Sequence, residues 1–594
     1  MESSRGGGGG HGTNPQLGTR SPAATAPAHL PTPSTSAHEA GEVAEAYHGS
    51  NAGPFVSKVA AAIDARLGIS SKEQMHIPML DAPLFGTINP LQSYDWGRGR
   101  SSNIQSGNGS TSEAFHVLPP RRHADVLLSL YWDYCEALEP CLDQRRFSRA
   151  YEAIYAGGES DYDECVFHST LNMVFALASQ LQESIPAAER DRASAAFFLR
   201  AWSLLRPEAA VWEAGSLELV QCLLLMSRYL QCAGNTKLMW MVEGSAVRVA
   251  VALGLHHFDR PSPDGEEGAR LRREVWTGIA YMEKNMSWIL GRPLTVNLLP
   301  SSSRPAAPSH DKGATAFISD KILELEEFHS QLLLFQSLSN TGFADYLPQS
   351  TTAAKPDIHT AQRFDERLMK LSASFESYQG SVEDGAFRRA IIFRLRVPHA
   401  RLLIFRPMFT RFCLSQTQAA SQASPLNMTD RSLEDRIYQD CATICLESSQ
   451  KIIELVSADQ RANGGAGILP WWYRAFWLCI ASQHVVAAML RPDVFGAVAP
   501  AAWATALAAY QAEEHLGPAL ERLSTTWGVI GQKVADLHNQ QGEDQMVPVE
   551  AASDPNFQNV FQYLGLGAGV DGTLGLGLEN ESWFEGVENF HWGF

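Results

Sequence analysis

Apolar residues recur at helical spacing along most of the chain. The first clear stripe begins near Ala124 and contains Val126, Leu127, Leu130, Tyr131, Tyr134 and Leu138, with Pro140 at its end. The strand-like alternation of apolar and polar positions is nearly absent. The same helical spacing recurs over residues 167–182, 193–205, 216–232, 238–253, 271–290, 318–338, 358–378, 387–405, 435–456, 472–490 and 501–537. The pattern therefore predicts an all-α body between about residues 120 and 540.

Two of these helices carry residues that interrupt the simple pattern. In the helix expected over 216–232, the apolar residues share one face, and Glu218, Gln221 and Arg228 fall outside it. Pro398 is expected to kink or break the helix that contains it, because proline lacks a backbone N–H and its ring clashes with the preceding turn.

The most apolar run of the chain lies between Arg474 and Arg491. It is sixteen residues long, from 475 to 490, and it is interrupted by Gln483 and His484. A helix that spans a bilayer needs about twenty apolar residues. We therefore interpret this run as a core helix and expect no membrane partner.

The segments on either side of the body differ from it in composition. Residues 1–52 are rich in Gly, Ser, Thr, Pro and Ala, a composition that cannot offset the entropy of ordering, so we expect disorder there. A short amphipathic helix is predicted from Phe55 to Leu67, and it carries Val59 and Ile63 on its apolar face. The Pro, Ser and Gly content up to residue 119 indicates a linker.

The charge of the chain is uneven. The 594 residues carry 47 Lys and Arg against 65 Asp and Glu, a formal net charge of −18, so DNA binding would need a local basic module. No Lys or Arg follows Lys533, and nine carboxylates follow Gly542. The aromatic residues among them are Phe557, Phe561, Tyr563, Trp583, Phe584, Phe590, Trp592 and Phe594. This pattern favours a disordered segment that binds a partner, with a merely solubilising tail as the alternative.

The basic residues form small groups. Arg121, Arg122 and His123 precede the first long helix, and Arg270, Arg272 and Arg273 open another. A third group repeats through one helical region and consists of Arg388, Arg389, Arg394, Arg396, Arg401 and Arg406. These arginines alternate with apolar residues, so an amphipathic helix that pairs with acidic neighbours explains them better than DNA binding does.

Signatures of catalysis or metal binding are weak. The G-x-G-x-x-G string at Gly567, Gly569 and Gly572 follows no predicted strand and opens no helix, so it fails the test for a dinucleotide site. His256 and His257 would diverge by about 100° on a helix and would not chelate one metal, and at least one is expected at a surface or interface. We assign no catalytic, cofactor-binding, metal or DNA-binding residue, and we expect no enzyme.

The nine cysteines indicate buried hydrophobic side chains rather than a disulfide framework or a metal site. Their number is odd, and no two are spaced C-x2-C. Cys441 and Cys445 lie one helical turn apart in an apolar stretch, where a small buried side chain is the simpler interpretation.

Several strings in order resemble the fungal-specific transcription factor domain, the middle homology region of fungal zinc-cluster regulators. The strings are LLSLYWDYCEALEP from Leu127 to Pro140, then LNMVFAL from Leu171, RAWSLL from Arg200, GSLELVQCLL from Gly215, GSAVRVAVALGLH from Gly244, REVW from Arg273, GRP from Gly291, and PHARLLIFRP from Pro398. The resemblance implies a large helical regulatory domain over 120–410, with 411–540 as the C-terminal helical part of the same body. Residues 1–52, the linker over 53–119 and the acidic and aromatic tail over 541–594 flank it.

One element of that family has no counterpart here. The resemblance implies a six-cysteine cluster that holds two zinc ions and binds DNA, yet residues 1–134 contain no cysteine. Zinc and direct DNA binding therefore map to no position. This suggests either a relative whose zinc module was lost or one whose first exon is missing from this sequence.

The resemblance implies a nuclear regulator of fungal transcription, in a pathway-specific or secondary-metabolite role. It would reach promoter DNA directly or through a zinc-cluster homologue, and its tail would recruit coactivators. Homo- or heterodimers and a small-molecule inducer are further expected partners. Two alternatives remain open: a negative regulator that sequesters a zinc-cluster homologue, and a helical ligand-binding protein.

Overall fold

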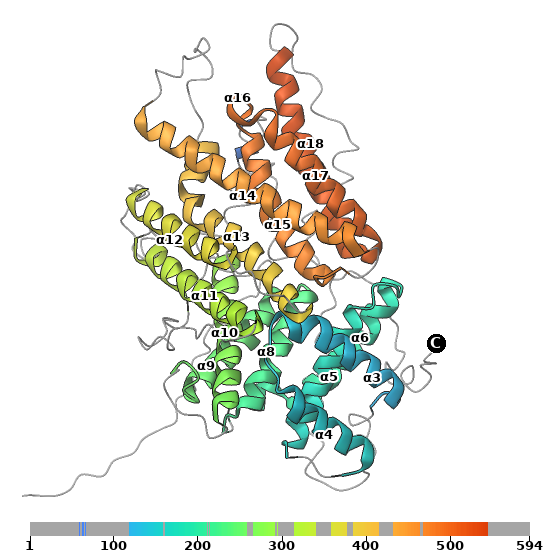
Figure 1. The fold of residues 1–594 in the computed structure, drawn as a ribbon. Coiled ribbons are helices and arrows are strands. Elements are labelled where there is room, and N and C mark those ends of the chain that lie inside the picture. Colours follow the sequence, from blue (N-terminus) through green and yellow to red (C-terminus); the bar gives the residue numbers. More distant parts are fainter. Residues whose placement is uncertain are drawn as a thin grey trace, which may run out of the picture. The chain divides into compact units, whose positions relative to one another are not determined.

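The protein is built from helices (Figure 1), and the described part of this computed structural model contains no strand. The structure describes residues 118–158, 161–210, 214–257, 265–290, 314–339, 358–376, 384–414, 432–463 and 467–543, with the single positions 59, 62, 63, 66, 212 and 294. The helices are α3 (Arg121–Leu130), α4 (Gln144–Ala156), α5 (Glu164–Gln180), α6 (Ala187–Leu205), α7 (Pro207–Ala210), α8 (Leu217–Cys232), α9 (Thr236–Ala252), α10 (Gly265–Leu290), α11 (Ala314–Ser339), α12 (Ile358–Glu376), α13 (Asp384–Leu414), α14 (Leu433–Asn463), α15 (Trp471–Met489), α16 (Pro492–Phe495), α17 (Val498–Glu513) and α18 (Pro518–Glu543). The predicted all-α class is confirmed.

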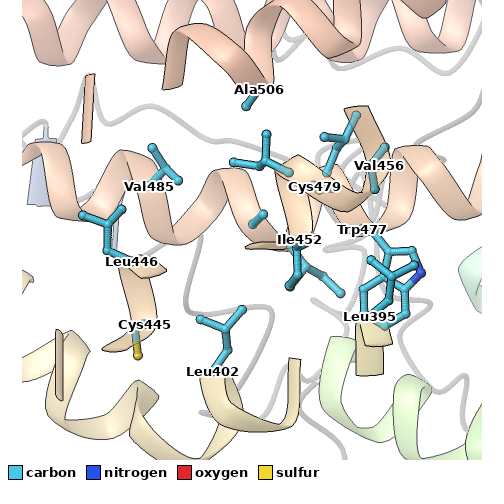
Figure 2. Close-up of a cluster of buried hydrophobic side chains, with 14 of the residues drawn as sticks. Leu395, Leu402, Cys445, Leu446, Ile452, Val456, Trp477, Cys479, Val485 and Ala506 are labelled. Atoms are coloured by element: carbon cyan, nitrogen blue, oxygen red, sulfur yellow. The ribbon is translucent and has the colours of Figure 1, made fainter. Parts of the chain in front are cut away.

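Buried side chains form two hydrophobic cores. The first core gathers residues between Ala124 and Met286, from α3 to α10. The second core gathers chiefly residues between Ala314 and Leu537, from α11 to α18. Figure 2 shows part of the second core, where Leu402 of α13, Ile452 of α14, Val485 of α15 and Ala506 of α17 belong to one buried cluster. Most helices therefore bury their apolar side chains within one core, whereas Leu138, Leu181 and Cys232 of the first half lie in the second core.

The last predicted helix, over 501–537, is wrong as a single element. α17 ends at Glu513, a 3-10 turn covers Glu514–Leu516, and α18 begins at Pro518. Gly517 lies between them with φ +149, a conformation that side chains rarely adopt. The Gly-Pro pair thus separates two helices whose apolar patterns happen to run on in sequence.

The break predicted as one outcome at Pro398 is also absent. α13 runs from Asp384 to Leu414 and includes both Pro398 and Pro407. Each proline removes one backbone hydrogen bond. α13 packs against α11, α12 and α14, and its side chains are buried on both sides of Pro398. Tertiary packing keeps the helix in one piece in spite of the local preference.

The face assignment made for residues 216–232 needs correction. α8 is buried on nearly all sides, and Gln221 and Arg228 are buried with its leucines. They are tolerated because both find acceptors in the turn around Pro140: Gln221 donates to the carbonyl of Cys141, and Arg228 donates to the carbonyl of Glu139 over 2.8 Å. In the first stripe, Val126 is similarly misassigned, since it is 45% exposed.

The short helix expected over 55–67 is helical at its described positions. Val59 and Ile63 are buried in the second core. Arg66 donates to the carbonyl oxygen of Leu490 at 2.9 Å and to that of Cys413 at 3.1 Å. Its guanidinium thus caps the carboxyl ends of α13 and α15, where cations are favoured.

Several predictions fall outside the described residues. These are the disorder of residues 1–52, the acidic and aromatic tail over 541–594 beyond the end of α18, and the glycine string at 567–572. Among the helices that can be described, none combines the length and apolarity that crossing a lipid bilayer requires. α15, which contains the most apolar run, is a buried helix of the second core.

Candidate functional site

The segment after α3 is shaped by one buried carboxyl group. A π-helix covers Tyr131–Glu136, an element that often occurs where a helix serves a local function. The Glu136 carboxylate accepts hydrogen bonds from the backbone N–H groups of Cys141 at 2.7 Å and Leu142 at 2.8 Å, and from the Tyr131 hydroxyl at 2.8 Å. These bonds fix the turn around Pro140. The neighbouring Glu139 is buried in consequence.

Glu139 begins a chain of buried charges that we call the ionic junction. Its members are Glu139, Arg228 of α8, Lys284 of α10, Glu326 of α11 and Arg396 of α13. Arg396 donates to the carboxylates of both Glu139 and Glu326, at 2.8 and 2.9 Å. Lys284 Nζ lies 2.5 Å from the second oxygen of Glu326, and Arg228 Nε lies 3.3 Å from Glu139. Positive and negative side chains thus alternate through the network in the order Arg228, Glu139, Arg396, Glu326 and Lys284.

The electrostatics of the junction depend on this alternation. No member exceeds 8% exposure. Burial alone would raise the pKa of Glu326, but Lys284 and Arg396 outweigh it and hold that pKa at about 2. Burial lowers the pKa of Lys284, and Glu326 opposes that shift. The guanidinium of Arg396 also lies over the ring of Tyr281, 3.6 Å from its centroid.

The junction joins the two cores. Glu139, Arg228 and Lys284 come from the part of the chain that builds the first core, and Glu326 and Arg396 from helices of the second. Removing one partner of a buried ion pair leaves an uncompensated charge and costs about 3–5 kcal/mol. The relative placement of α8, α10, α11 and α13 is therefore tied to the integrity of one charge network.

Three of the remaining arginines of α13 pair with acidic neighbours, as predicted, whereas Arg388 donates to the carbonyl of Ile468 and lies over the ring of Tyr134. Arg394 contacts Glu376 at 3.1 Å, and Arg401 contacts Asp365 at 2.7 Å. Arg389 lies 3.4 Å from Glu274 of α10. These pairs lie nearer the surface than the junction does, apart from Arg389, which is 6% exposed.

The histidine pair behaves differently from the prediction. The ring centroids of His256 and His257 are 3.9 Å apart rather than diverging. The reason is that α9 ends at Ala252 and the chain turns at Gly254, which has φ +70, so neither histidine is helical. His257 is exposed, as expected for one of the two.

The cysteines are free, and seven of the nine are buried, Cys441 and Cys445 among them. The interpretation of that pair as buried side chains agrees with this placement. Within the described ranges, no group of three or more His, Cys, Asp or Glu side chains could hold a metal ion.

Sequence reasoning identified part of the junction. It singled out Arg396 as a member of a run that pairs with acids, and it assigned Arg228 to the wrong surface. It did not select Glu139, Lys284 or Glu326. The available signal was an arginine inside a helix that is apolar on nearly all sides, as Arg228 is in α8, because such a charge needs a buried partner.

Comparison with known proteins shows a family match over most of the first core and most of α11. A model of the fungal specific transcription factor domain matches residues 128–334. Sorbicillinoid biosynthetic cluster transcription factor 2 of Penicillium rubens is 31% identical over 531 residues, which cover 86% of this chain and 73% of the relative. Sorbicillinoid biosynthetic cluster transcription factor sor3 of Hypocrea jecorina is 32% identical over 84% of this chain and 70% of the relative.

A third relative is more distant. Transcription factor FBD3 of Gibberella moniliformis is 24% identical over 66% of this chain and 54% of its own length. The family match includes four members of the ionic junction, and Arg396 lies beyond it on α13. The chain belongs to the family of fungal transcription factors that carry the fungal specific transcription factor domain.

Proposed function

We propose that this protein is a nuclear, pathway-specific regulator that controls the genes of a secondary-metabolite cluster. The observation that carries the proposal is the similarity to two relatives that are named as transcription factors of a sorbicillinoid biosynthetic cluster, along most of both chains. The helical body acts in regulation and not in catalysis. Three relatives are each named as transcription factors, which supports this part of the proposal.

The helical body connects the matched domain to the helices beyond it. Arg396 of α13 bonds to Glu139 and Glu326, which both lie within residues 128–334. A shift of α13 would therefore strain its bonds to Glu139 and Glu326, and a shift of either glutamate would strain α13 in the same way. This coupling supports a regulatory body that works as one unit from α3 to α18.

DNA and coactivators are contacted by other parts of the protein. Promoter DNA is reached through a zinc-cluster module, carried either by this protein or by a homologous partner. The acidic and aromatic residues over 541–594 recruit coactivators, since separated aromatics among carboxylates can enter an apolar groove. Dimers form through the helical body.

Gene deletion followed by transcript profiling tests the regulatory role. Loss of transcripts from one contiguous gene cluster, restored by the full chain, is the expected result. Unchanged transcripts under conditions in which the wild-type gene is expressed would contradict the proposal. An increase in cluster transcripts on deletion would instead favour the sequestering role, especially if a zinc-cluster protein co-purifies with the chain.

A fusion experiment tests the tail separately. Residues 541–594 are fused to a foreign DNA-binding domain, and a reporter gene is expected to be activated. The matched control replaces the eight aromatic residues of the tail by alanine and keeps every carboxylate. Equal activation by both fusions would show that charge alone suffices and would contradict the role given to the aromatic residues.

A further inference from the structure

Four described positions between residues 59 and 66 lie on one face of a short helix, and we call them the strap. They are Val59, Ala62, Ile63 and Arg66, at the spacing i, i+3, i+4 and i+7, and all four are helical. Val59 and Ile63 are buried in the second core, and Ala62 packs against it. The strap is therefore bound to the body through apolar side chains and one cation.

Arg66 joins the ends of two different helices. Its Nη1 donates to the carbonyl oxygen of Leu490, the residue that follows α15, at 2.9 Å, and its Nη2 donates to that of Cys413 in the last turn of α13 at 3.1 Å. Arg491 makes a second link, since its Nη1 donates to the carbonyl of Phe412 at 2.8 Å and its guanidinium lies 4.0 Å from the centre of the Phe412 ring. We call these two links the arginine clamp.

The carboxyl end of α13 depends on such external partners. The last carbonyl groups of a helix have no partner within the helix. Pro407 also lacks a backbone N–H, so the last turns of α13 contain one hydrogen bond fewer. The clamp supplies donors to two of these carbonyls, those of Phe412 and Cys413. Removing Arg66 therefore loosens the end of α13 and weakens its link to the end of α15.

The same two helices carry contacts with the first core. α13 reaches the first core through Arg396, and α15 does so through Trp471. Arg396 precedes Cys413 by 17 positions and Trp471 precedes Leu490 by 19, which corresponds to about 25–30 Å along each helix. α14 packs against both helices. The arginine clamp thus holds the far ends of two helices that join the cores.

The charges at the clamp oppose tight docking of the strap. Burial lowers the pKa of Arg66, and the neighbouring Arg491 lowers it further, although Asp493 acts in the opposite direction. Asp493 is already paired with Arg491 at 2.7 Å. Docking therefore brings one cation beside another, which partly offsets the favourable contacts of the strap and makes its release easier.

We propose that the strap and the arginine clamp form a conformational device that couples the N-terminal part of the chain to the contacts between the two cores. With the strap docked, α13 and α15 are held together at their carboxyl ends and keep the positions that the ionic junction and Trp471 require. With the strap released, the two helices shift more easily relative to each other, and their contacts with the first core weaken. The coupling is reciprocal, so a change at those contacts also weakens docking of the strap. Its use in regulation rests on the proposed function, whereas the coupling itself does not.

Hydrogen–deuterium exchange of the full chain, read by mass spectrometry, tests the clamp. Arg66→Met removes both bonds to carbonyls, so exchange in the last turns of α13 and α15 is expected to rise at least about tenfold, the effect of one charge-assisted hydrogen bond. Arg272→Met is the matched control, because Arg272 also donates to a carbonyl at a helix end, that of Leu253 after α9, at 3.2 Å. Unchanged exchange at either helix end in Arg66→Met, or an equal rise there in Arg272→Met, would overturn the proposal.

A substitution at the other end of α15 tests the coupling. Trp471→Phe removes the N–H that bonds to Gln180, and it is expected to raise exchange of residues 59–66 at least about threefold. Trp202→Phe is the matched control, because Trp202 of α6 is buried in the first core, where its ring centroid lies 5.8 Å from that of Phe198. An equal rise in both variants would reflect a general loss of stability and would contradict the coupling, as would unchanged exchange of the strap in Trp471→Phe.

The double variant that combines Arg66→Met with Trp471→Phe measures the coupling directly. Substitutions more than about 10 Å apart without shared partners normally act independently. We expect Arg66→Met to raise exchange at the end of α13 by a smaller factor in the Trp471→Phe chain than in the wild type. The same factor in both chains would show that the strap and the core contacts are independent, which is incompatible with the proposal.

The outcomes separate the coupling from the function. If exchange shows the coupling and cluster transcripts do not respond to deletion of the gene, the conformational device stands and the regulatory role fails. If transcription depends on the protein and Arg66→Met leaves exchange at both helix ends unchanged, the regulatory role stands and the device fails.

Discussion

The two cores contact each other in two chemically different ways. At the ionic junction, five buried charges satisfy one another, from Arg228 to Lys284. The second place of contact is centred on α15 and combines one ion pair, between Arg474 and Glu183 at 3.1 Å, with hydrogen bonds to backbone carbonyls. There Trp471 donates to the carbonyl of Gln180 at 3.1 Å, and Arg190 donates to the carbonyl of Leu516. We call this second region the α15 contact.

The difference concerns what remains when one side chain is lost. At the ionic junction, loss of Arg396 leaves each of two buried carboxylates with one cation instead of two, and loss of a carboxylate leaves buried cations without it. At the α15 contact, the acceptors at Gln180 and Leu516 are neutral carbonyls, whose desolvation costs less. A substitution at the junction is therefore expected to cost more than the loss of either carbonyl bond. The loss of stability caused by a substitution should also vary with pH at the charged side chains and not at the neutral carbonyls.

The largest effect is expected at the centre of the junction. Arg396→Met keeps the unbranched apolar stem of the side chain and removes both bonds to Glu139 and Glu326. The free energy of unfolding should fall by about 3–5 kcal/mol, because two buried charge-assisted hydrogen bonds are lost and each carboxylate keeps a single cation, Arg228 or Lys284. Urea denaturation followed by circular dichroism measures the change.

A second substitution checks the cause of that loss. Adding Glu139→Gln to Arg396→Met removes the carboxylate that has lost its closer cation and that still pairs with Arg228. The loss in the double variant should be smaller than the sum of the two single losses, since both changes remove the same Glu139–Arg396 bond. A loss below about 1 kcal/mol for Arg396→Met, or a purely additive double variant, would show that the junction contributes little.

Glu243 provides a buried acid without such a network. Burial and the neighbouring Glu283 raise its pKa to about 10, although Arg248 opposes the shift. Because the folded state retains a proton that the unfolded state loses above about pH 4.3, stability falls as pH rises from there to about 10. Glu243→Gln should abolish this slope, which amounts to at most about 1.4 kcal/mol per pH unit. Denaturation curves from pH 5 to 9 measure it.

Glu326 should show the opposite sign over a different range. Its folded pKa of about 2 lies below the unfolded value, so its stabilising contribution is present at neutral pH and is lost as pH falls from about 4.3 towards 2. An identical pH slope for wild type and Glu243→Gln between pH 5 and 9 would contradict the raised pKa of Glu243.

A smaller effect is expected at the α15 contact. Trp471→Phe keeps an aromatic ring next to Arg190 and removes the N–H that bonds to Gln180. The expected loss is about 1–2 kcal/mol, which corresponds to one neutral buried hydrogen bond and some lost contact area. Trp212→Phe is the control, because Trp212 is 87% exposed and should unfold like wild type. A loss as large as that of Arg396→Met would remove the distinction between the two contacts.

The smallest effect is expected two residues from the centre of the junction. Arg394 lies on the same helix as Arg396 and also pairs with a glutamate, but its side chain is 41% exposed. Arg394→Met should change the free energy of unfolding by less than about 1 kcal/mol, and high salt should reduce the change further. A comparable loss for Arg394 and Arg396 would show that burial does not decide the effect.

The sequence predicts the helices better than it predicts the junction. Apolar spacing suffices to place α8, α9 and α15 to within a few residues, because each helix must bury a stripe. It also identifies the arginine run of α13. Glu139 and Arg396, however, are separated by 257 positions, and no local pattern shows that they meet.

Other misses have local causes. Polarity alone predicts that Gln221 and Arg228 lie on the outer face of α8. Both are buried instead, because buried polar groups are stable where hydrogen-bond acceptors exist. Apolar spacing predicts one helix over 501–537 because it continues across Gly517, where the structure has a break. The local effect of Pro398 predicts a kink or a break, yet α13 continues through it because the helix packs against α11, α12 and α14.

Arg66 has a mechanical consequence for whatever precedes it in the chain. Its two bonds, together with Val59 and Ile63, anchor this part of the chain to the second core. With the anchor in place, a module attached ahead of residue 59 is tethered at the carboxyl ends of α13 and α15. The volume that such a module can reach is then centred on these helix ends. The anchor formed by Arg66, Val59 and Ile63 therefore affects the local concentration of the module.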